Sequence, residues 1–167
     1  MINTSIRRAL VLSSLVLGAT TLFSSKAMAD TVNLNGTVAS TLALTTAPTA
    51  AATALPLSGS TQRIVQVADL GISTNNEQGY TVTATSGSLA KTGGTSIAYQ
   101  VTTTADTVAA VAVDFAIASG TNYTFGSTAA NAPSSNGRDL YIMYTPAALQ
   151  DPGAYAGIIT VTVADNS

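Results

Sequence analysis

Side chains that usually carry enzymatic chemistry are scarce in this chain of 167 residues. Histidine and cysteine are both absent, which removes Ser-His-Asp and Cys-His arrangements and nearly all zinc, copper and haem sites. Carboxylates remain, and the pairs that could face each other across a cleft are Asp106 with Asp114 and Asp139 with Asp151. These acids lie mostly at predicted turns, where Asp is favoured for local hydrogen bonding, so we expect no enzymatic activity.

Binding motifs are equally sparse. The sequence contains no Asp-x-Asp-x-Asp-Gly calcium loop and no glycine-rich phosphate loop that opens a helix. Six tyrosines could form a platform for stacking sugar rings, with Tyr123 and Tyr144 as the two not assigned to the predicted core. We therefore expect no cofactor and no metal. A self-complete secreted binding module for glycan or extracellular matrix is the alternative function.

The first residues have the features of a secretory signal peptide. Arg7 and Arg8 precede an apolar run over residues 9–23, which has a secretory length and is short for a membrane span. Residues 26–29 end in the small-x-small pattern that signal peptidases accept. We predict a cleaved signal peptide over residues 1–29 and export to the periplasm, the cell surface or the extracellular space; an uncleaved anchor is the alternative.

The remaining chain, residues 30–167, has the length of a single domain with a real core. It keeps three basic residues, Arg63, Lys91 and Arg138, against eight acidic ones. That balance disfavours nucleic acid and anionic membrane surfaces as partners. Without cysteine the domain has no disulfide, and no segment after the signal is apolar and long enough to span a bilayer.

Alternating apolar and polar residues predict β-strands through most of this domain. Residues 139–145 are apolar on both faces, which indicates the central strand of a sheet. A slip in parity between Val67 and Leu70 predicts a bulge near residues 68–69. Residues 46–54, rich in Thr and Ala, are interpreted as a flexible linker or loose edge. Strands are predicted at 31–45, 63–73, 80–85, 97–102, 113–118 with 122–125, 139–145 and 152–163.

About seven to nine strands separated by turn signals, with no convincing helix, predict an all-β fold. The expected architecture is an antiparallel immunoglobulin-like β-sandwich, and a barrel is the competing topology.

Three stretches together resemble small exported bacterial fimbrial (pilin-like) or spore-coat-U-type sandwich subunits. They are the alternating strand Val32–Leu44, the Ser73–Val82 hairpin and the closing strand Gly153–Val163. The resemblance implies a structural, cell-surface or adhesion protein whose sandwich lacks one strand. The N-terminal segment of the next subunit would then fill the groove by donor-strand complementation.

The resemblance also implies partners: other copies of this chain or related subunits, and a periplasmic chaperone and usher. Many such pilins carry a disulfide, which this chain lacks. The alternative is that residues 31–45 form the first strand of a complete domain. The candidate donor or assembly strand presents Val32, Leu34, Val38, Leu42 and Leu44 on one face.

Overall fold

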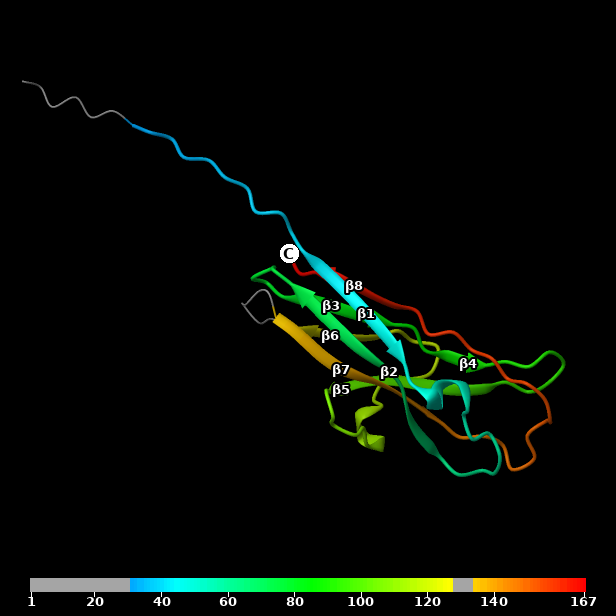
Figure 1. Ribbon diagram of the computed structural model, residues 1–167. Helices are drawn as coiled ribbons and strands as arrows, with labels where there is room; N and C mark the ends of the chain where they lie inside the picture. The colour runs from blue at the N-terminus through cyan, green and yellow to red at the C-terminus, as the bar shows by residue number, and fades with distance from the viewer. Residues whose placement is uncertain (1–30, 128–133) are drawn as a thin grey trace, which may run out of the picture. The chain divides into compact units, whose positions relative to one another are not determined.

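Two antiparallel sheets face each other across an apolar core (Figure 1). The structure is a computed structural model that describes residues 31–127 and 134–167. Within them, one sheet has the strand order β1-β2-β7-β5-β4 and the other the order β6-β3-β8. This arrangement confirms the predicted all-β sandwich. The strands are β1 (Leu42–Pro48), β2 (Arg63–Thr74), β3 (Tyr80–Ala84), β4 (Gly87–Leu89), β5 (Ile97–Ala105), β6 (Tyr123–Ser127), β7 (Ser134–Tyr144) and β8 (Val161–Asp165).

The predicted central strand is β7, which lies between β2 and β5. Its two faces are both covered, which explains why residues 139–145 are apolar without alternation. Leu140, Ile142 and Tyr144 point into the core between the sheets. Tyr141 and Met143 point the other way and pack against the connection between β5 and β6, where Phe115 is buried.

The predicted bulge in β2 is confirmed, with the register shift between Gln66 and Ala68. Val65 packs on the core before the shift, Ala68 and Leu70 pack on it after the shift, and Val67, the extra residue between them, also faces the core. The extra residue therefore changes which parity faces inward, because side chains alternate along a strand.

Several predicted elements are wrong because they depend on which sheet a strand joins. Gly79 has the positive φ of 80° expected of it, but residues 75–79 do not form a hairpin. They connect β2 in one sheet to β3 in the other. Residues 113–118 form no strand, and a short 3₁₀ helix, η2 (Ala112–Asp114), begins that stretch. The three-residue strand β4 was not predicted.

The first and the last predicted strands have different bounds in the structure. Residues 31–41 are not in a strand, so the first strand is Leu42–Pro48 rather than 31–45. The segment 46–54 contains the end of this edge strand, followed by the 3₁₀ helix η1 (Ala50–Thr53). The last strand covers Val161–Asp165, and within 152–160 Ala156 forms an isolated bridge to Ala90.

The chain divides into two units, of which the second, Val38–Ser167, contains the sandwich. The described part of the first unit, residues 31–37, has no regular secondary structure, and all its residues are exposed. The predicted signal peptide, residues 1–29, lies outside the described residues. Among described residues, no helix is both long and apolar enough to cross a membrane.

Candidate assembly groove

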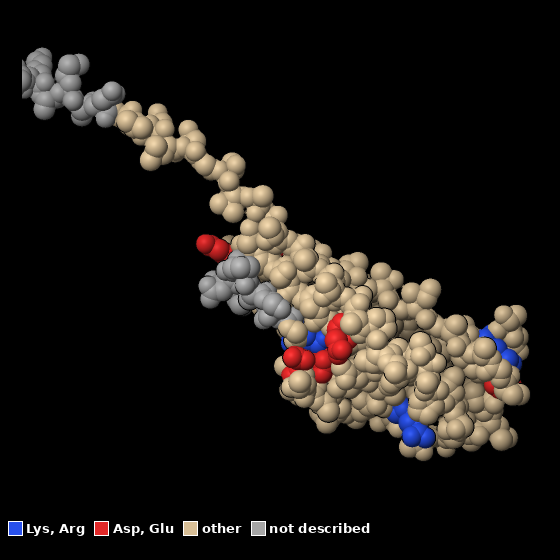
Figure 2. All heavy atoms as spheres, in the orientation of Figure 1, with Lys and Arg blue, Asp and Glu red and all other residues tan. Residues whose placement is uncertain are grey.

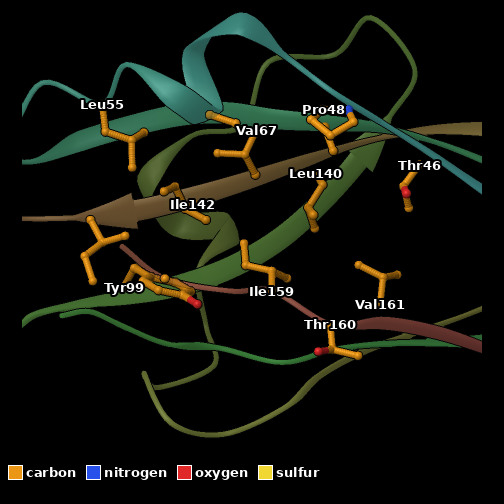
Figure 3. Close-up of a pocket in the computed structure, with 14 residues that line it drawn as sticks. Thr46, Pro48, Leu55, Val67, Tyr99, Leu140, Ile142, Ile159, Thr160 and Val161 are labelled. Carbon is orange, nitrogen blue, oxygen red and sulfur yellow. The ribbon is translucent and has the colours of Figure 1, made fainter. Parts of the chain in front are cut away.

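An apolar groove of about 540 Å³ opens between the two sheets, along one side of the sandwich (Figure 3). One wall comes from the second half of β1 and the η1 segment, and the other from residues 157–161 before and at the start of β8. Core side chains of β2, β5 and β7 form the floor. The lining residues are Thr46, Pro48, Ala52, Leu55, Val67, Ala68, Leu89, Tyr99, Leu140, Ile142, Gly157, Ile159, Thr160 and Val161.

The groove exists because β1 is covered along only half of its inward face. Leu42 and Leu44 are half-buried against a core cluster that also contacts Val161 and Val163 of β8. Thr46 and Pro48 share their parity and line the groove, yet both are exposed. The inward face of β1 therefore continues past the point where the opposite sheet covers it.

The opposite wall is held in place where the chain crosses from one sheet to the other. Ala156 and Ala90 exchange two backbone hydrogen bonds of 2.8 and 2.9 Å, beside the edge strand β4. Thr160 is bonded to the other sheet, since its amide donates to the Thr85 hydroxyl at 2.8 Å. Residues 157–160 thus span the gap between sheets without forming a strand that closes it.

Close packing fixes this crossing. A Cβ on Gly157 would lie 3.1 Å from both the Ser88 carbonyl oxygen and Leu89 Cδ2, so glycine permits the close approach. The Tyr99 hydroxyl donates to the Ile158 carbonyl oxygen at 3.0 Å. Burial raises the pKa of Tyr99, which keeps the phenol protonated as a donor.

The five predicted donor residues fall into two groups. Leu42 and Leu44 belong to β1 and pack in the chain's own core. Val32, Leu34 and Val38 are 79%, 90% and 91% exposed. The structure therefore divides the predicted strand into a core part and an exposed part, which we call the extension (residues 31–41).

Sequence reasoning missed the groove wall formed by Thr46, Pro48 and Leu55. These residues lie in or just after a stretch whose composition is that of a linker. The available signal was parity, because Thr46 and Pro48 continue the even-numbered series begun by Leu42 and Leu44.

Acidic side chains gather elsewhere, on the outer face of the five-stranded sheet. Asp69 and Asp139 are direct register partners on β2 and β7, and Asp106 lies in the adjoining turn. Asp139 is only 4% exposed and accepts a hydrogen bond from the Thr107 amide at 3.1 Å. Burial raises its pKa, as do the negative charges of Asp106 and Asp69 and a hydrogen bond with Asp69, against the lowering effect of the Thr107 amide. Figure 2 shows acidic side chains close together, with a basic side chain beside them, on a surface where most of the other side chains are uncharged.

The carboxylate pairs considered from sequence have separate local roles. Asp114 accepts a hydrogen bond from the Val111 amide at 2.8 Å, which caps η2. Asp151 accepts from the Thr95 amide at 3.2 Å. Among the described residues, no group of three or more His, Cys, Asp or Glu side chains is arranged to hold a metal ion.

A sugar-stacking platform has no support from the tyrosines. Tyr144, one of the two candidates, is buried in the core, and Tyr123 packs against that core while bonding to the Thr103 hydroxyl at 3.0 Å. A second groove, at the start of β5 and the end of β7, has a mixed polar and apolar lining without charged side chains. Its polar lining residues are Gln62, Thr95, Ser96, Gln100, Ser119, Thr145 and Gln150.

Comparison with known proteins gives no further assignment. The chain matches no family model, no curated protein and no solved structure.

Proposed function

We propose that this protein is an exported, non-enzymatic structural subunit that assembles by β-strand addition. The carrying observation is the open groove, in which Thr46 and Pro48 continue the inward face of β1 without a covering strand. The proposed occupant is the extension of a second copy of the chain. A periplasmic chaperone would hold the groove before assembly.

The extension has the chemistry that the groove requires. Val32, Leu34 and Val38 lie on one parity, so an extended conformation places them on one side. Neither residues 31–41 nor the groove lining contains a charged side chain. Burial in the groove therefore carries no cost for desolvating an ion.

The size of the groove sets how much of the extension it takes. The wall formed by residues 157–161 would be roughly 13 Å long in an extended conformation, which matches about five residues of a bound strand. Five strand residues present two or three side chains to one face of the strand. Burying each Val or Leu contributes about 1.5–3 kcal/mol before the costs of association. Losing one such side chain weakens the contact by at least about tenfold.

Leu34→Asp tests the proposal, with Leu149→Asp as the matched control. Leu149 is 95% exposed and lies outside both the extension and the groove. We expect oligomers of the wild type and of Leu149→Asp in size-exclusion chromatography and on unheated denaturing gels, and loss of those oligomers for Leu34→Asp. A monomeric wild type, or equal assembly of the two variants, would contradict the proposal.

A further inference from the structure

The root of the extension is held by the side chain of Asn75, which follows β2. Its Nδ2 donates to the Ala39 carbonyl oxygen at 2.7 Å, and its Oδ1 accepts from the Thr41 amide at 2.7 Å. The Asn75 backbone amide also donates to the Thr41 carbonyl oxygen at 3.1 Å. Asn75 thus bonds to both the first and the last residue of the segment 39–41, which directly precedes β1.

Asp165, at the end of β8, supplies a second attachment. Its Oδ2 accepts from the Ser40 hydroxyl at 2.8 Å, while Oδ1 accepts from the Thr74 hydroxyl at 2.7 Å. Thr74 is the last residue of β2 and is buried. Residues 39–41 are therefore bonded to both sheets of the sandwich, although they are exposed and form no strand.

We infer that Asn75 and Asp165 are positioning residues that fix the course of residues 39–41, the root of the extension, on the sandwich. The ladder between β1 and β2 ends at the pair Leu42 and Thr74, and beyond it one backbone bond, from the Asn75 amide to the Thr41 carbonyl oxygen, continues the pairing by one residue. An exposed segment beyond a ladder frays unless side chains hold it. Here side-chain bonds extend the order back to Ala39.

This inference rests on the proposed function for its consequence. Val38 is a proposed donor residue, and Ala39 is the first anchored one. When the roughly five residues that the groove holds end at Val38, no free linker remains between the part bound by the next subunit and the part bound by its own. Successive subunits would be joined stiffly.

Pulsed electron–electron double resonance between two spin labels measures this order directly. Because the chain has no cysteine, two introduced cysteines are the only sites that the spin label modifies. Spin labels are placed at Val38→Cys and at Ser88→Cys, an exposed site on β4. All labelled proteins also carry Leu34→Asp, so that a neighbouring copy does not order the label by binding the extension, and they are diluted with unlabelled protein so that only distances within one chain contribute. We expect a narrow distance distribution that Asn75→Ala widens by roughly 10 Å, the reach of three freed residues in a flexible chain.

Two further variants make the outcome decisive. Ser40→Ala removes one bond to Asp165 and should widen the distribution less, while Asn122→Ala, at an exposed asparagine outside the root, should leave it unchanged. An unchanged width in Asn75→Ala, with a melting curve that shows a folded protein, would overturn the inference. Because the labelled proteins are compared in the Leu34→Asp background, the width reports on the root alone, and that result is distinguishable from Leu34→Asp failing to block assembly, which would overturn the proposed function.

Discussion

The pair of carboxyl groups on the outer sheet face should make this protein more stable in mild acid than at neutral pH. Asp139 on β7 is buried and hydrogen-bonded to Asp69 on β2, and its pKa is raised. Asp106 adds a third negative charge from the turn after β5, and Tyr141 packs beside the pair with its own pKa raised by burial and by both acids. Two carboxylates in contact repel unless they share a proton.

The direction follows from proton linkage. With the pKa of Asp139 higher in the folded state than its ordinary value of 3.8, the folded protein holds a proton that the unfolded chain has released. The resulting stabilisation is complete below the unfolded pKa and is lost as pH rises through the folded pKa. One such proton changes the free energy of unfolding by at most about 1.4 kcal/mol per pH unit.

Asp139→Asn isolates this contribution. The amide of Asn donates to Asp69 at every pH, while its oxygen can still accept from the Thr107 amide. Wild type and variant should have similar unfolding free energies near pH 4. The variant should become more stable by about 1 kcal/mol at neutral pH, the typical net value of one hydrogen bond.

Urea unfolding at a series of pH values measures this difference. Glu77→Gln, at an exposed loop position, serves as the control for loss of a negative charge. The reasoning is refuted if the difference between Asp139→Asn and wild type does not change with pH, or if it grows toward acid.

Two further predictions concern backbone fit. Thr107 has a φ of 64°, which a β-branched residue rarely adopts, so Thr107→Asn should raise the unfolding free energy by about 0.5–1 kcal/mol in urea titrations. A Cβ at Gly71 would collide with the Thr45 hydroxyl of the edge strand, so Gly71→Ala should cost about 1–3 kcal/mol in the same assay. Much of that loss should return in the double variant with Thr45→Ala, and a purely additive double variant would count against the collision.

The features of the fold that could be predicted from sequence are those that depend on local period. The bulge in β2 appears as a parity slip, and the central position of β7 appears as a run that is apolar on both faces. Partner choice has no such local signal. Residues 75–79 have the composition of a hairpin loop, and only the pairing of β2 with β1 and β7 shows that they connect two sheets.

The same limit applies to the predicted donor residues. Leu34 and Leu42 are indistinguishable by period, since both continue one alternating face. They differ because the ladder with β2 ends at the pair of Leu42 and Thr74, and beyond it Asn75 bonds to Thr41 and Ala39 but not to Leu34. The end of a strand far along the chain thus decides where core ends and extension begins. Neighbouring sequence could not reveal that boundary.

The groove and the extension have matching requirements under the proposed assembly. The groove exposes wall residues such as Thr46 and Pro48 and leaves Leu55 and Ile159 only partly buried, and an uncovered groove between open strand edges invites uncontrolled association. The extension exposes valine and leucine side chains that its own sandwich does not bury. The groove of one copy would be covered by the extension of a neighbouring copy, which would in turn bury the apolar side chains of that extension. The same sequence period that builds β1 would then also build the contact between subunits.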